Sequence, residues 1–274
     1  MGATIEVLPD LSEDYALTAE QVRDFLRDGH VLLRGLASAA EVALFRPVIL
    51  EVLRSVVEER DSQGRIDDYS ALFTQVTNAW RKSEAVRRFA FARRFAKAAA
   101  ELMGVAGVRL YHDQALIKRP GGQATPWHQD QYYWPLNTED TITMWMPLVD
   151  VTTDMGPMIF ASTSHRSGYR ADRPISDATA AAVARLVSER GLPLTSAELR
   201  AGDASFHSGL TLHSSHANRS ATAREVMTVI YFAEGTRLKE PENEHQRVDM
   251  EVFVPGLGPG DPAASPLNPL LYRR

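Results

Sequence analysis

From Val108 onward the chain carries short runs rich in β-branched and aromatic residues, separated by Gly, Pro, Asn and Asp. Runs of this length and composition are typical of strands, because such side chains pack well on a pleated surface. A succession of them predicts a β-sandwich or barrel. The predicted strands are residues 108–118, 141–151, 156–161, 203–213 and 225–233.

The first hundred residues are predicted to be mainly helical. Thr18 and Ser38 are each followed three positions later by Gln or Glu, which is the spacing of a capping box. Residues 38–60 carry apolar side chains at helical spacing, with a kink or restart expected at Pro47, which lacks a backbone N–H. A third helix is predicted over 84–103, and we interpret its arginines as a solvated face.

The later part of the chain is expected to cover the β core. A helix is predicted over 177–190, ending at Gly191, and the Pro- and Gly-rich tail from Glu240 is interpreted as an ordered segment without regular structure. We expect a single domain over the 274 residues. Its expected parts are a mainly helical N-terminal part (1–105), a β core (106–235) and a C-terminal covering segment (236–274).

The amino-acid composition limits the metal ligands and binding partners that the chain can have. The chain contains no cysteine, which excludes disulfides, thiolate nucleophiles and metal–thiolate sites, so a metal would be held by His, Asp, Glu or water. The formal net charge of −5 gives no electrostatic footprint for nucleic acid or an anionic membrane, and no apolar run is long enough to span a bilayer. We expect a cytoplasmic monomer or homodimer that acts on a small molecule and binds neither nucleic acid nor membrane.

A candidate metal site begins at His128 and Asp130. On an extended strand, residues two apart project from the same face with α-carbons about 6.6 Å apart, so a metal can bridge them. Alone, this pair is weak evidence, and a hydrogen-bonded histidine is the alternative. The surrounding aromatic residues strengthen it, because they make an unpaired charge costly. These residues are Trp127, Tyr132, Tyr133 and Trp134.

His213 is the preferred third ligand, with His207 and His216 as alternatives. Two imidazoles and one carboxylate form the facial triad of a non-haem Fe(II) oxygenase, which leaves other coordination positions open. Arg224 follows His213 by eleven residues, and its guanidinium suits the far carboxylate of a dicarboxylic cosubstrate. The alternative for Arg224 is a structural ion pair with Glu225.

Five segments of the chain, which include the His128–Asp130 pair and run on from His213 to Arg224, together resemble the phytanoyl-CoA dioxygenase family of Fe(II)- and 2-oxoglutarate-dependent oxygenases. The resemblance implies a double-stranded β-helix (jelly roll, cupin-like) core packed by N-terminal helices. It also implies Fe(II) on His128, Asp130 and His213, with 2-oxoglutarate and O2 as cosubstrates. The matching segments are residues 111–122, 127–130, 143–148, 213–224 and 265–270.

The resemblance also assigns cosubstrate contacts. Arg224 would bind the distal carboxylate of 2-oxoglutarate, helped by Gln114, Ser215, Trp145 and Gln75. An aromatic strand residue can equally belong to the core, and a strand glutamine can satisfy backbone groups.

The substrate wall is predicted separately. Tyr132, Tyr133, Trp134 and the 162–175 loop are candidates, because small-molecule sites are usually aromatic-lined clefts. One departure from the family lies in this loop: Ser162-Thr163-Ser164-His165 stands where many relatives read Pro-Gly-Ser-His, so no contact from Ser164 is carried over.

The function predicted is a dioxygenase that hydroxylates an unactivated C–H bond of a small molecule or natural product, releasing succinate and CO2. Desaturation, epimerisation and cyclisation are alternative outcomes of the same chemistry. Halogenation is disfavoured, because related halogenases replace the carboxylate that Asp130 retains. Two further alternatives are a zinc hydrolase with the same ligands, which leaves Arg224 without a role, and a non-catalytic cupin-like binding module, which predicts a broken triad.

Overall fold

The computed structural model describes residues 8–63, 72–174 and 176–274. Its framework is two antiparallel sheets, which confirms the predicted mainly β fold. The larger has seven strands in the order β1-β8-β5-β10-β3-β11, with β2 also paired to β3, and the smaller has four in the order β4-β9-β6-β7. The strands are β1 (His30–Leu33), β2 (Phe73–Thr77), β3 (Gly107–Lys118), β4 (Thr125–His128), β5 (Thr141–Pro147), β6 (Met158–Ala161), β7 (Leu194–Ser196), β8 (Ala204–Ser208), β9 (His213–Ser215), β10 (Arg224–Ala233) and β11 (Leu270–Arg273).

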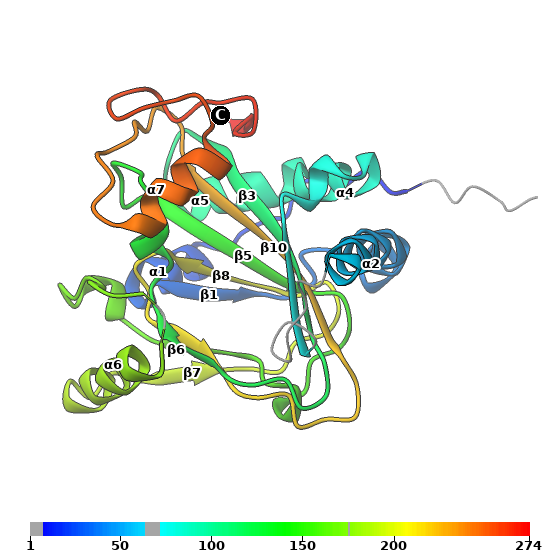
Figure 1. Ribbon diagram of the computed structural model, residues 1–274, viewed down its shortest axis with the longest axis horizontal. Coiled ribbons are helices and arrows are strands. Elements are labelled where there is room, and N and C mark those ends of the chain that lie inside the picture. The colour runs from blue at the N-terminus through cyan, green and yellow to red at the C-terminus, as the bar shows by residue number, and fades with distance from the viewer. Residues whose placement is uncertain (1–7, 64–71, 175) are drawn as a thin grey trace, which may run out of the picture.

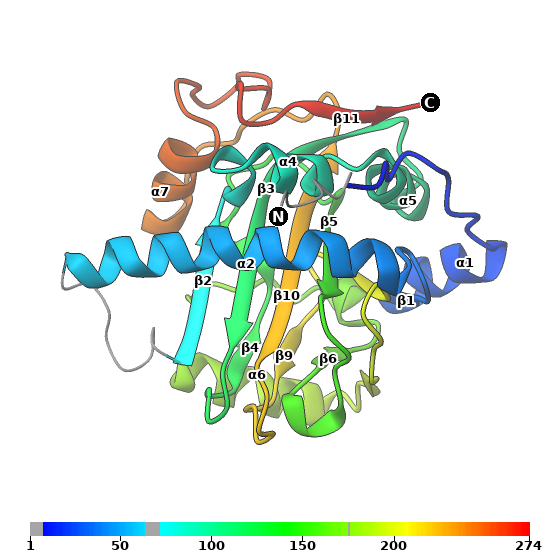
Figure 2. The ribbon, with the colours of Figure 1, turned by 90° about the vertical axis from the view of Figure 1, so that its right-hand side faces the viewer.

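Helices pack around these sheets. Figure 1 shows α7 over the upper end of the larger sheet and α6 beside the smaller one, and in Figure 2 α2 crosses in front of β2, β3 and β10. Apolar side chains of α2 and α5 pack with strands of the larger sheet in one core. Among the described residues, no helix combines the length and apolarity that a bilayer span requires. The helices are α1 (Ala19–Asp28), α2 (Ala39–Ser62), α4 (Glu84–Ala90), α5 (Arg93–Met103), α6 (Asp177–Glu189) and α7 (Glu244–Phe253).

Local signals placed the first helices well. Both predicted capping boxes are present, with the Thr18 and Ser38 hydroxyls accepting from backbone N–H groups three residues on. α2 runs through Pro47 without a restart. Phe45 and Ile49, on either side of that proline, are both fully buried, so one continuous apolar face holds both halves of the helix on the sheet.

The predicted third helix is two helices, α4 and α5, separated at Phe91 and Ala92. The interpretation of its arginines as a solvated face was wrong for Arg94. That side chain is buried and pairs with Glu41 while donating to two backbone carbonyls, so it joins α5 to the start of α2. The other three arginines, Arg87, Arg88 and Arg93, are exposed.

Regular structure also occurs where none was predicted. β1 and β2 lie in the N-terminal part, where the dominant helical spacing hid two short strands. The tail contains α7 and β11, so the prediction of a segment without regular structure was wrong. The Asn243 side chain caps α7 by accepting from the Gln246 N–H, a local signal that the Pro and Gly content further along obscured.

Candidate metal centre

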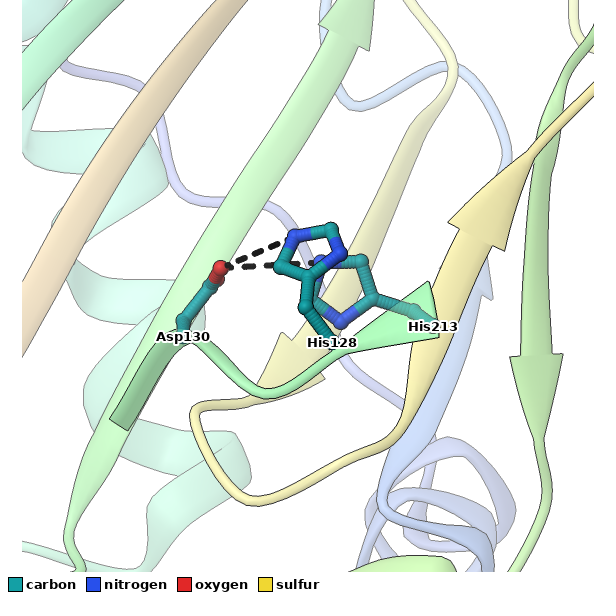
Figure 3. Close-up of side chains that lie close together, drawn as sticks. All are labelled: His128, Asp130 and His213. Carbon is teal, nitrogen blue, oxygen red and sulfur yellow. Dashed lines mark ion pairs between the residues drawn. The ribbon is translucent and has the colours of Figure 1, made fainter. Parts of the chain in front are cut away.

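The structure brings His128, Asp130 and His213 together (Figure 3). His128 ends β4 and His213 opens β9, and the two residues are partners across that ladder. Their Nε2 atoms lie 3.5 and 3.6 Å from Asp130 Oδ1. One ligand atom from each of the three residues lies within 4.8 Å of the others, which is the spacing of a metal site.

The His-x-Asp pair does not share one extended strand, as the sequence prediction assumed. β4 ends at His128, and Asp130 begins a short 3-10 turn, Asp130–Tyr133. Between them Gln129 is buried, and its amide donates to the Leu210 carbonyl at 2.6 Å and accepts from the Ala171 N–H at 2.9 Å. These bonds hold the start of the turn, and the turn carries the carboxylate to the imidazoles.

The hydrogen bonds of the two histidines fix which ring nitrogen is free. His128 Nδ1 lies 2.8 Å from the Pro126 carbonyl and His213 Nδ1 lies 2.9 Å from the Thr211 carbonyl. Because a carbonyl oxygen only accepts, each Nδ1 carries a proton, so Nε2 is the ring nitrogen that can offer a lone pair to a metal. Backbone carbonyls orient metal-binding histidines in this way.

The two oxygens of the Asp130 carboxylate also have different partners. Its Oδ2 accepts from Thr143 Oγ1 at 3.0 Å and faces His207 Nε2 at 3.2 Å, which leaves Oδ1 toward the two ligand imidazoles. Burial alone would raise the pKa of Asp130, but His213, His128 and His207 hold it well below its usual range. Burial, reinforced by His128, lowers the pKa of His213 well below its usual range. One carboxylate beside two imidazoles, each able to bind a metal through Nε2, is a donor set that fits Fe(II).

The two alternative third ligands take other positions. His207 lies on β8, buried, and orients the Asp130 carboxylate instead of joining the three-residue ligand set. His216 lies just after β9, and its backbone carbonyl accepts from Lys118 Nζ.

The triad opens into a cavity of about 470 Å³. All five predicted cosubstrate residues line it, as do Tyr133 and Trp134. Tyr132 does not: it lines two other recesses, one with His128 and Tyr169 and one with Asn243 and Gln246. No described residue of the predicted 162–175 loop lines the cavity either, and Ile175 lies outside the described residues. The predicted residues on the wall are Gln75, Gln114, Tyr133, Trp134, Trp145, Ser215 and Arg224.

Arg224 is a buried cation on this wall. Its guanidinium lies over the Trp145 ring at 5.4 Å and donates to the Gly156 carbonyl, while its Nε has no hydrogen-bond partner. Burial lowers its pKa to about 10. The predicted alternative, an ion pair with Glu225, was wrong, because Glu225 bonds Arg46. Within the described ranges Arg224 has no carboxylate partner, although burying an unpaired charge is costly.

Sequence reasoning missed two charged residues at this site. Lys118 ends β3 and is the cross-strand partner of Arg224. Asp249 lies on the unpredicted helix α7 and lines the same cavity beside His112 and Phe253. For Lys118, the available signal was a lysine at the end of an apolar strand, just before Pro120. For Asp249, it was the Asn243 cap at the start of its helix.

Asp249 supplies a pH-dependent prediction. Its carboxylate accepts from Tyr111 Oη at 3.0 Å, and burial raises its pKa from 3.8 to about 7 although that hydrogen bond lowers it. The folded protein therefore binds more protons at this site than the unfolded chain between about pH 4 and 7, so stability falls as pH rises through this window. Asp249→Asn should raise the free energy of unfolding more at pH 8 than at pH 5, by about 2 to 3 kcal/mol. Urea denaturation at both pH values measures this, and an equal change at both would contradict it.

Comparison with known proteins agrees with this geometry. The sequence model of a family described as phytanoyl-CoA dioxygenase (PhyH) matches residues 25–226. A probable alpha-ketoglutarate-dependent hypophosphite dioxygenase of Stutzerimonas stutzeri is 23% identical over 225 residues, 78% of each chain.

Two solved structures from nogalamycin biosynthesis are also similar. The non-haem alpha-ketoglutarate-dependent carbocyclase SnoK superposes with a TM-score of 0.74 and 28% identity, covering 93% of this chain and 96% of its own. The epimerase SnoN, in complex with Fe3+, alpha-ketoglutarate and nogalamycin RO, superposes with a TM-score of 0.71 and 25% identity, covering 92% and 98%.

Proposed function

The chain belongs to the phytanoyl-CoA dioxygenase family, and on that premise we propose that it is an iron- and 2-oxoglutarate-dependent dioxygenase whose metal ligands are His128, Asp130 and His213. One observation carries the assignment of residues. The triad and the unpaired, buried guanidinium of Arg224 lie on the wall of the same cavity. A dicarboxylic 2-oxo acid needs the metal for its 2-oxo acid end and a cation for its distal carboxylate.

The protein's own groups position the reactants. Once bound, iron and 2-oxoglutarate supply the oxidation of a C–H bond with release of succinate and CO2. The Nε2 atoms of His128 and His213 and the Oδ1 of Asp130 would hold the metal, and Thr143 and His207 keep that carboxylate turned toward it. Arg224 would bind the distal carboxylate of the cosubstrate, with Ser215 beside it.

The finer description of the fold follows from the same premise. The two sheets would be the two halves of a double-stranded β-helix, a jelly roll. The antiparallel pairing in both sheets and the placement of His128 and His213 on the smaller one support this proposal.

The remainder of the cavity would hold a small-molecule substrate. Aromatic side chains on its wall, among them Phe73, Tyr133, Trp134 and Phe253, suit an apolar ring system. Asp249 would face a hydrogen-bond donor of that substrate, since Tyr111 is its one hydrogen-bonding partner among the described residues.

Hydroxylation is the leading outcome, and one observation favours a second. The solved structures described above, similar over more than nine-tenths of this chain, are named as a carbocyclase and an epimerase. Ring formation or epimerisation of a natural product is therefore the alternative. The zinc hydrolase reading is disfavoured, because a metal-bound water leaves the unpaired Arg224 cation unexplained.

An anaerobic titration tests the assignment. We expect metal-free protein given Fe(II) and then 2-oxoglutarate to develop the saturable visible charge-transfer band of a chelated 2-oxo acid, and His213→Ala to lack it. Folded protein that binds Fe(II) but shows no band at millimolar 2-oxoglutarate would overturn the proposal.

A further inference from the structure

Lys118 is a second buried cation near Arg224. It is the last residue of β3, directly across the β3–β10 ladder from Arg224, and its side chain is only 1% exposed. Neither residue forms an ion pair with a carboxylate in the part of the chain that the structure describes. Burial, and then the charge of Arg224, lowers the pKa of Lys118 to about 7. Two buried basic groups held this close favour an anion beside them, which would keep Lys118 charged.

The hydrogen bonds of Lys118 set the direction of two hydroxyl groups. Its Nζ donates to Ser215 Oγ at 2.8 Å, to the His216 carbonyl at 3.1 Å and to Thr125 Oγ1 at 3.3 Å. When Lys118 is protonated, as it would be beside a bound anion, its ammonium group has three protons and accepts nothing, so these bonds use all of its protons. Ser215 and Thr125 must therefore accept from Lys118, and their own hydroxyl protons remain available to donate elsewhere.

Both hydroxyl groups lie where a cavity ligand can receive those protons. Ser215 and Thr125 are partners across the β4–β9 ladder, and both line the cavity that also holds Arg224 and the triad. Among the described residues, both hydroxyls accept from Lys118 and neither donates a hydrogen bond to another protein group. Together with the unpartnered Nε of Arg224, they make a group of unused donors on one part of the wall.

We propose that Lys118 is a positioning residue for the distal carboxylate of the 2-oxo dicarboxylic acid: it turns the Ser215 and Thr125 hydroxyls into donors toward that carboxylate and adds a second positive charge behind them. The inference rests on the proposed function, because it needs the distal carboxylate to lie beside Arg224. It assigns Lys118 a role that is separate from the metal.

A pair of cosubstrate probes isolates this role. 2-Oxoglutarate and 2-oxovalerate share the 2-oxo acid group and chain length, but 2-oxovalerate has a methyl group where the distal carboxylate would be. Dissociation constants for both would be measured anaerobically from the charge-transfer band with Fe(II), in the wild type, Lys118→Met and Lys118→Gln. Lys82→Met, an exposed lysine, is the matched control.

We expect Lys118→Met to weaken 2-oxoglutarate binding about 10- to 100-fold and to change 2-oxovalerate binding by less than about 2-fold, since a hydrogen bond to a charged group is lost only with the dicarboxylate. Lys118→Gln, which keeps a donor but no charge, should lie between. Adding Lys118→Met to Ser215→Ala should cost less than the two single changes multiplied, because Lys118 acts through Ser215.

Equal weakening of both acids would show that Lys118 only supports the fold, and unchanged 2-oxoglutarate binding would also overturn the inference. If Lys118→Met does not fold, Lys118→Gln decides by the same comparison. A wild type that forms no band with either acid would instead reject the proposed function, so the two failures are distinguishable.

Discussion

Asp130→Ala is expected to lower 2-oxoglutarate-dependent succinate release by on the order of 1000-fold or more. The change removes one of three ligands and the only negative charge among them, so the two remaining Nε2 atoms hold the metal poorly. The measurement is succinate formation, coupled or uncoupled to substrate, alongside an anaerobic Fe(II) titration. Succinate formation and Fe(II) binding should both fall.

The control for this change is Asp140→Ala, an exposed carboxylate ten residues further on, which should retain the wild-type rate. The comparison requires that Asp130→Ala is folded. Thermal unfolding without metal checks this. Succinate release within tenfold of the wild type, in folded Asp130→Ala, would reject Asp130 as a ligand.

The three proposed ligands could be predicted from the sequence because their chemistry is local. An imidazole, a carboxylate two residues on and a later histidine can be recognised without knowing how they meet. The groups that support them could not be recognised in this way. Thr143 and His207 reach Asp130 from β5 and β8, and that contact depends on the strand order of the larger sheet.

The positions of other site residues depend on strand register and local backbone geometry. Lys118 and Arg224 face each other because of one alignment of β3 with β10, which a composition-based strand prediction does not contain. Tyr132 and Tyr133 are neighbours in sequence and were both predicted for the substrate wall, yet only Tyr133 of the two lines the cavity, because the 3-10 turn places their side chains differently. Of the three predicted wall residues, Tyr133 and Trp134 line the cavity and Tyr132 does not.

Arg224→Met is expected to weaken 2-oxoglutarate binding by about 100- to 1000-fold, the larger effect of the two buried cations. The guanidinium is 2% exposed, lines the cavity and has an unused Nε–H, so it can meet a carboxylate directly, whereas Lys118 reaches one only through hydroxyl groups. The dissociation constant for 2-oxoglutarate, taken from the charge-transfer band, measures the loss. Arg224→Lys should recover only part of it, because a lysine cannot reproduce the planar fork of the guanidinium.

Arg219→Met, an exposed arginine five residues earlier, is the matched control and should bind 2-oxoglutarate like the wild type. The comparison also separates the reactions that the triad alone permits. A hydrolase that activates water on the same three ligands would lose metal and activity with Asp130→Ala but would not depend on a cation at Arg224. Unchanged 2-oxoglutarate affinity in folded Arg224→Met would therefore place the distal carboxylate elsewhere in the cavity. It would also leave the buried guanidinium to bind some other anionic group, the substrate's own included.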